Sequence, residues 1–165
     1  MFIKKVDKLD WPAKHFSIKE ISNESQRNTF VFNEKLIDTL ILVDQIREIV
    51  DQPVYVSDGC RFDEKYSYSQ HYFKKPFNAL DIYTKGYSSI DLMKVIEEND
   101  LGTGRGLYPG KQGAIDENTG FIHIDTRRGL SSKNGRVSRW YQDRNGNYRN
   151  YGEHYNDKPF DGLLE

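Results

Sequence analysis

The most regular pattern in the chain is a run of apolar residues at helical spacing between Glu34 and Val50. Apolar side chains recur there every three or four positions, at Leu36, Ile37, Leu40, Val43, Ile46 and Val50. This spacing predicts an amphipathic helix. Because Ile41, Leu42 and Ile49 fall on its more polar side, we expect the helix to be covered on more than one face and to act as a central packing element.

Two shorter helices are predicted before and after this one. Ser17 and Glu20 have the spacing of a capping box, which marks the start of a helix. A further helix should run from about Ser89 to Asn99, with its inward-facing residues at Leu92, Val95 and Ile96. Between the predicted helices, residues 57–76 hold few aliphatic side chains and are expected to form a polar loop that could carry chemistry.

Alternation with a period of two residues predicts strands in further segments. The segment "QPVYVS" is rich in β-forming residues. In "ALDIY" the alternation puts Asp81 on the opposite face from its apolar neighbours, and in "GFIHIDTR" it puts His123 and Asp125 on one face. Asn145 and Gly146 predict the turn of a hairpin between aromatic-rich arms. The glycine-rich segment "GTGRGLYPG" lacks the spacing of a nucleotide-binding loop.

The composition is that of a chain that folds. The 165 residues contain 36% hydrophobic and 30% charged residues, and 11 Tyr and 9 Phe supply core-forming surface, so we expect one domain over residues 1–165. The net charge of -1 provides no overall field for nucleic acid or an anionic membrane, and we expect neither as a partner. No stretch is apolar enough for a membrane span or a signal peptide, which predicts synthesis in the cytoplasm.

The candidate chemistry begins with Asp81, because a carboxylate among apolar residues needs a hydrogen-bonding, charged or metal partner. The single cysteine, Cys60, excludes an intramolecular disulfide and a cysteine-only zinc cluster. His71, Asp81 and His123 could instead form a zinc site of two imidazoles and one carboxylate with an open fourth position. A hydrogen-bonded polar pocket is the alternative, and Asp81 could then pair with Arg61 or Lys75.

Six segments in order resemble the zinc D-Ala-D-Ala carboxypeptidase family, which also includes phage endolysin endopeptidases. They are "PVYVSDGCR", "SQH", "ALDIY", "GRGLYPG", "GFIHIDTRRG" and "RWYQDRNGNY", and the resemblance spans about residues 15–151, followed by a polar tail. It implies an α+β fold, related to that of the hedgehog signalling domain, in which helices pack on a central antiparallel sheet that holds zinc. It also implies a zinc metallopeptidase that cleaves peptidoglycan stem peptides next to D-amino acids, as a carboxypeptidase or as an endopeptidase.

The resemblance implies roles for individual residues. His71, Asp81 and His123 correspond to the three zinc ligands of the family, and Arg61 to the arginine that holds a substrate carboxylate or carbonyl. Ser69 corresponds to a serine that contacts substrate. Tyr108 is expected to line the substrate cleft or to pack in the core. We expect a monomer of phage or prophage type, which acts at the cell wall after release or as a virion component.

Two departures from the family pattern bear on activity. The segment between His71 and Asp81 is longer than usual and lacks a common glycine, and Gly120 stands where many members have the acid that serves as the general base. Asp125 is our first candidate for the base, or else it orients the imidazole of His123. Asp116 and Glu117 are further candidates for the base.

These departures leave other functions open. One alternative is a catalytically inactive cell-wall-binding or phage structural module on the same fold. Another is single-stranded nucleic acid binding by the arginines that alternate with aromatic residues near the C-terminus, Arg136, Arg139, Arg144 and Arg149. A solvated hairpin accounts for the same pattern of charged and aromatic residues. His15 and His154 are expected to be structural or exposed.

Overall fold

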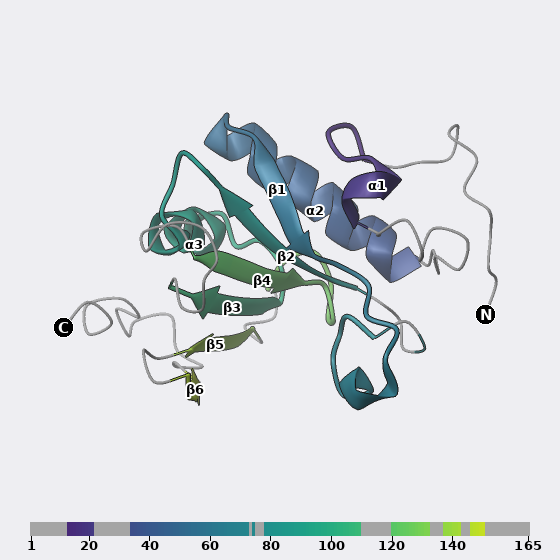
Figure 1. Ribbon diagram of the computed structural model, residues 1–165. Helices are drawn as coiled ribbons and strands as arrows, with labels where there is room; N and C mark the ends of the chain where they lie inside the picture. The colour runs from purple at the N-terminus through teal and green to yellow at the C-terminus, as the bar shows by residue number, and fades with distance from the viewer. Residues whose placement is uncertain are drawn as a thin grey trace.

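The chain forms an α+β fold in which two helices pack against a six-stranded sheet (Figure 1). The computed structural model describes residues 13–21, 34–72, 74, 78–109, 120–132, 137–142 and 146–150. Its helices are α1 (Ile18–Ile21), α2 (Glu34–Val50), the 3-10 helix η3 (Glu64–Tyr66) and α3 (Ser89–Glu98). Its strands are β1 (Val54–Asp58), β2 (Ala79–Thr84), β3 (Gly104–Tyr108), β4 (Phe121–Asp125), β5 (Ser138–Gln142) and β6 (Tyr148–Asn150).

The strands lie in the order β1-β2-β4-β3-β5-β6. The pair formed by β3 and β5 is parallel, and the other pairs are antiparallel. The predicted α+β class, with helices packed on a largely antiparallel sheet, is confirmed. No helix within the described part of the chain is both long and apolar enough to cross a membrane.

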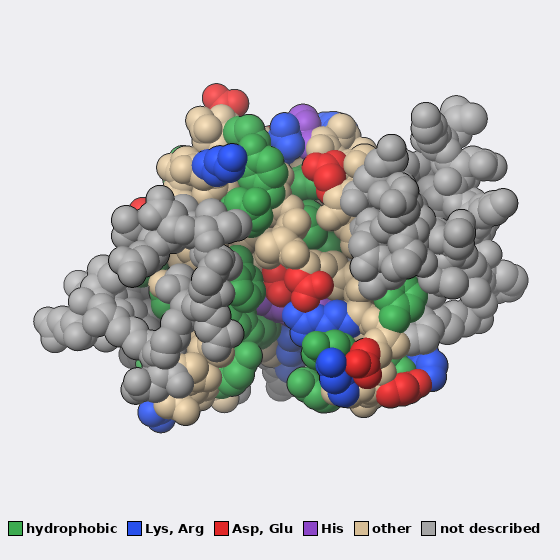
Figure 2. Space-filling view, viewed as in Figure 1, with side chains coloured by type: hydrophobic (Ala, Val, Ile, Leu, Met, Phe, Trp, Pro, Cys, Tyr) green, Lys and Arg blue, Asp and Glu red, His purple; other side chains and the backbone are tan. Residues whose placement is uncertain are grey.

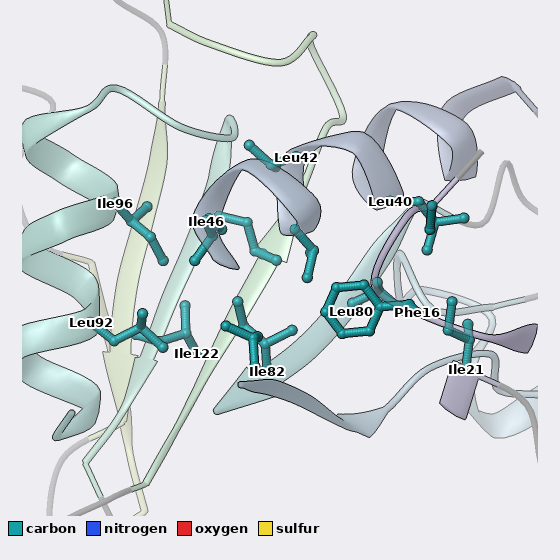
Figure 3. Packing of buried hydrophobic residues seen from close by; sticks show 14 of the residues in the cluster. Phe16, Ile21, Leu40, Leu42, Ile46, Leu80, Ile82, Leu92, Ile96 and Ile122 are labelled. Carbon is teal, nitrogen blue, oxygen red and sulfur yellow. The ribbon is translucent and has the colours of Figure 1, made fainter. Parts of the chain in front are cut away.

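Helix α2 has the predicted bounds and is buried on more than one side. Leu36, Leu40, Val43 and Ile46 are fully buried, and so is Leu42, which lies on the more polar side of the helical pattern. Ile49, from the same side, remains 45% exposed. Figure 3 shows α2 and α3 meeting the apolar side chains of the sheet in one continuous core.

The other predicted helix starts are also confirmed. Helix α3 begins after Ser88, whose hydroxyl accepts a hydrogen bond from the amide of Asp91 at 3.1 Å. Helix α1 is only four residues long, and the carboxylate of Glu20 accepts hydrogen bonds from the amide and the hydroxyl of Ser17. These contacts fix the first turns of both helices.

The pairing of β2 with β4 gives the sheet two different faces. Ile82 lies opposite Ile122, and both side chains belong to the core under the helices. Asp81 lies opposite His123 on the other face of the sheet. The alternation predicted for both strands is confirmed, and it brings two of the three candidate ligands, Asp81 and His123, together across a single strand pair.

Strand β3 was not predicted, because its glycines hide the strand pattern. Gly104 lies opposite Asp125 and Gly106 lies opposite His123. A Cβ atom at Gly104 would collide with the carboxylate of Asp125, and one at Gly106 would collide with the indole of Trp140. The two glycines therefore leave space above β3 for side chains from its neighbours.

The predicted hairpin is confirmed as the antiparallel pair of β5 and β6. Gly146, which lies between the two strands, has a φ of 84°, in the left-handed region that favours glycine. Several predictions concern residues outside the described part of the chain, namely those for Lys75, Asp116, Glu117, Arg136, Arg144, Asn145 and His154.

Candidate metal centre

Three buried side chains converge on the face of the sheet that is turned away from the helices. His71 comes from the loop before β2, Asp81 from the middle of β2 and His123 from the middle of β4. Their exposed fractions are 1%, 5% and 7%. Each offers one ligand atom, and the three atoms lie within 4.8 Å of one another. The long segment between His71 and Asp81 therefore does not prevent the predicted convergence.

The separations of these atoms match those of a tetrahedral metal site. Asp81 Oδ1 lies 3.2 Å from His71 Nε2 and 3.0 Å from His123 Nδ1, and the two ring nitrogens are 3.0 Å apart. Tetrahedral zinc with bonds of about 2.0 to 2.1 Å places its ligand atoms about 3.3 Å apart. His71, Asp81 and His123 could thus hold a metal ion.

The imidazole of His71 is oriented by the backbone of the preceding loop. Its Nδ1 lies 2.7 Å from the carbonyl oxygen of Gly59, so the Nδ1–H donates there and Nε2 keeps its lone pair for the centre. Gly59 packs so closely against the carbonyl of Ile21 that a side chain would not fit. The amide of His71 donates to the hydroxyl of Ser69 at 3.1 Å. The loop thereby fixes which nitrogen of His71 faces the centre.

The imidazole of His123 is held from its other side by Asp125. His123 Nε2 lies 3.0 Å from Asp125 Oδ2, while Nδ1 faces Asp81. The carboxylate of Asp125 is fully buried and is also bonded to the guanidinium and the amide of Arg127. Of the two roles expected of Asp125, this geometry favours orienting His123 over serving as the base, because its oxygens are already engaged.

The electrostatics of the cluster favour a positive charge between the carboxylates. Burial alone would raise the pKa of Asp81, but the charge of His71 and hydrogen bonds from both imidazoles hold that pKa far below its usual range. Burial alone would lower the pKa of His123, whereas its hydrogen bonds to Asp125 and Asp81 raise it to about 9. The cluster therefore attracts a proton or a cation.

Arg61 lies at the rim of this cluster and is 29% exposed at its side chain. Its Nη2 is 3.5 Å from Asp81 Oδ2, the carboxylate oxygen that faces away from the two imidazoles. The alternative pairing expected for Asp81 with Arg61 thus occurs together with the histidine contacts. On the face seen in Figure 2, acidic side chains, a histidine and basic side chains gather at the centre.

Aromatic side chains form one wall of the centre. The indole of Trp140 lies 5.0 Å from the imidazole of His123, centroid to centroid, and its Nε1–H donates to the hydroxyl of Tyr108 at 3.1 Å. Tyr108 stacks on Phe121 at 4.3 Å. Tyr108 thus lies on the same face as the candidate ligands and contacts the aromatic residues beside them. The guanidinium of Arg127 covers the ring of Trp140 at 5.4 Å.

Sequence reasoning missed several residues that build the centre, namely Asp58, Gly59, Arg127 and Trp140. Gly59 acts through its carbonyl, which carries no side-chain signal. Arg127 lies two residues beyond Asp125, and a basic residue at that spacing could have indicated the ion pair. Trp140 reaches His123 across β3, and only the strand order shows that these residues are near neighbours.

Comparisons with protein-family models, with curated proteins and with solved structures found no match to this chain. The candidate metal centre therefore rests on the geometry of the chain itself.

Proposed function

We propose that this protein is a zinc-dependent peptidase that hydrolyses peptidoglycan stem peptides next to D-amino acids. The observation that carries the proposal is the convergence of His71 Nε2, Asp81 Oδ1 and His123 Nδ1 within 4.8 Å in a buried cluster. The substrate class is supported by the resemblance of the six segments to the zinc D-Ala-D-Ala carboxypeptidase family. Action at the bacterial cell wall follows from that substrate class.

Zinc fits the donor set, because two imidazole nitrogens and one carboxylate oxygen leave a fourth position open for water or substrate. When bound there, zinc would polarise the scissile carbonyl and lower the pKa of its water. His71, Asp81 and His123 would hold the ion. The carbonyl of Gly59 and the carboxylate of Asp125 would keep both imidazoles in the tautomer that binds metal.

Residues at the rim would bind and orient the peptide. Arg61 is partly exposed beside Asp81, which places a hydrogen-bond donor next to the metal position for a peptide carbonyl. Tyr108 would contact the substrate from the aromatic wall. Ser69 uses its hydroxyl oxygen to accept the amide of His71, so it would support the ligand loop and could still donate its proton to a substrate.

The first test is the zinc content of the purified protein and of His71→Ala, Asp81→Ala and His123→Ala. We expect about one zinc per chain in the unmodified protein and loss of zinc in each variant, because each side chain supplies one ligand. The matched control is His15→Ala, since His15 lies near Glu48 on α2 rather than in the cluster. Elemental analysis after gel filtration gives the ratio of zinc to protein.

The outcomes separate the metal site from the substrate class. A folded protein that takes up no zinc would contradict the metal centre. A zinc protein that releases no products from purified peptidoglycan, as judged by mass spectrometry, would contradict the peptidase assignment. It would favour the alternative of a cell-wall-binding or phage structural module on this fold, which a peptidoglycan sedimentation assay would test.

A further inference from the structure

The guanidinium of Arg61 already has a carboxylate partner. Its Nε lies 2.7 Å and its Nη2 lies 2.5 Å from Asp58 Oδ2. The ring of Tyr66 covers the guanidinium at 5.0 Å, and Asp81 lies 3.5 Å from Nη2 on the side of the metal centre. Asp58 therefore occupies the Nε and Nη2 edge, which an arginine commonly presents to a carboxylate.

A bulge in β1 puts Asp58 in this position. Val56 pairs with Ile82, and the register then shifts so that Asp58, rather than Ser57, lies opposite Asp81. In a regular strand Asp58 would lie opposite Leu80, on the face that packs against the helices. A bulge of one residue changes the face to which a side chain points. The bulge thus aims Asp58 at Arg61.

A bound peptide would meet the charges at this rim in one of two ways, depending on whether it ends at the residue after the scissile bond. A peptide that ends at the residue after the scissile bond would bring its terminal carboxylate close to Arg61, where Asp58 and Asp81 already lie. Repulsion between the terminal carboxylate of the peptide and these two carboxylates disfavours binding, unless one of the carboxylates moves away. A peptide that continues, or that ends in an amide, presents a neutral carbonyl and meets no such repulsion.

We propose that Asp58 is a specificity-determining residue that makes the site select internal peptide bonds over bonds next to a free C-terminal carboxylate. This inference rests on the proposed peptidase function and deepens it, because it assigns endopeptidase rather than carboxypeptidase action. Asp58 has a half-exposed side chain at the rim, 41% accessible, so a bound peptide could reach it directly. Arg61 then donates to a carbonyl, not to a carboxylate.

The test compares two peptides that differ in one charge. Acetyl-Lys-D-Ala-D-Ala with a free C-terminus and the same peptide as its C-terminal amide are bound to the unmodified protein and to Asp58→Asn. Calorimetry with and without zinc gives both dissociation constants, and methylation of the scissile nitrogen prevents cleavage. We expect the unmodified protein to bind the amide at least as tightly as the acid. In Asp58→Asn the acid should gain about tenfold relative to the amide.

The matched control is Asp63→Asn, which removes the same charge from the segment that follows β1. The carboxylate of Asp63 is exposed and bonded to Lys65 rather than to Arg61, so the ratio of acid to amide affinity should not change. Asp58→Ser removes the same charge and should reproduce the effect of Asp58→Asn, so the test does not depend on the folding of a single variant. The proposal is overturned if the unmodified protein prefers the acid. It is also overturned if Asp58→Asn shows an unchanged ratio or binds neither peptide.

Failure of the proposed function would appear elsewhere. If the proposed function is wrong, the protein will bind no zinc or will not cleave peptidoglycan. The specificity is tested separately, as the ratio of the affinities for the acid and the amide with and without metal. A protein that binds zinc, cuts peptidoglycan and prefers the free acid would keep the peptidase function and lose the role of Asp58.

Discussion

Two roles were predicted for Asp125, and its contacts favour one of them. It touches the nitrogen of His123 that faces away from the centre, and Arg127 holds its carboxylate. A carboxylate in this position fixes the tautomer and the orientation of the imidazole. A base that takes protons from water during each turnover would need an oxygen free to reach the centre.

Replacement of Asp125 by asparagine should weaken metal binding by about 10- to 100-fold, which is typical when such an orienting carboxylate is lost. Competition with a chromophoric chelator measures the zinc affinity. Asp91→Asn is the control, because Asp91 is an exposed carboxylate at the start of α3. Unchanged zinc affinity with a large loss of turnover would contradict the orienting role and restore the base assignment.

At the scale of single residues, the sequence predicted what alternation can reveal. The faces of Asp81, His123 and Asp125 follow from a period of two, and the structure bears them out. Alternation gives the wrong face for Asp58, because the bulge after Val56 turns its side chain to the opposite face of the sheet. The sequence contains no pattern that predicts this bulge. Cys60, two residues after Asp58, is buried, with 4% of its surface exposed.

At the scale of elements, α3 is joined to the sheet by partly buried ion pairs. Arg105 on β3 is fully buried and contacts Glu97 at 2.5 Å and Asp100 at 2.7 Å, both near the end of α3. Arg139 on β5 donates two hydrogen bonds of 2.8 Å to the same Glu97. Arg139 therefore contributes to this junction, on the sheet face opposite the candidate metal centre.

Glu97→Gln should destabilise the fold by about 2 kcal/mol, because Arg105 and Arg139 lose their shared, charged hydrogen-bond acceptor while Asp100 still pairs with Arg105. Urea denaturation measures the free energy of unfolding. The neighbouring Glu98→Gln is the control, since Glu98 is exposed. Equal stability of the two variants would show that the ion pairs contribute little.

Elements in which apolar residues recur with a regular period were predictable from the sequence, and elements without such a pattern were not. The bounds of α2 follow from its apolar repeat, because 17 residues give a long pattern. Strand β3 escaped prediction because Gly104 and Gly106 replace β-forming residues, and a charged residue, Arg105, faces the core side between them. Tertiary contacts override the local β-propensities in β3. The glycines leave space for Asp125 and Trp140, and Arg105 forms an ion pair with α3.

At the scale of the whole molecule, Cys60 reports on opening of the fold. Burial, and then the charge of Asp58, raise the pKa of its thiol to about 12. The unfolded thiol has a lower pKa, so this group contributes stability at pH values below about 9 that is lost as the pH rises towards 12. At pH 8 a thiol reagent should thus label Cys60 only in opened molecules.

We expect zinc to slow this labelling, because an ion that binds only the folded protein lowers the population of opened forms. Mass spectrometry follows the modification of Cys60 over time, with and without zinc. His123→Ala should abolish the effect of zinc while keeping the thiol. Labelling of the unmodified protein as fast as in urea would contradict burial of Cys60, and labelling indifferent to zinc would contradict coupling of the site to the fold.

The pairing of β2 with β4 also determines when, during synthesis, the candidate metal site can form. Asp81 and His123 are 42 positions apart along the chain and meet only across these two strands. A chain that has left the ribosome no further than residue 81 carries two of the three ligands and lacks the strand that supplies the third. An ion held by all three side chains would therefore be bound late in synthesis, and incomplete chains would not bind it at this site.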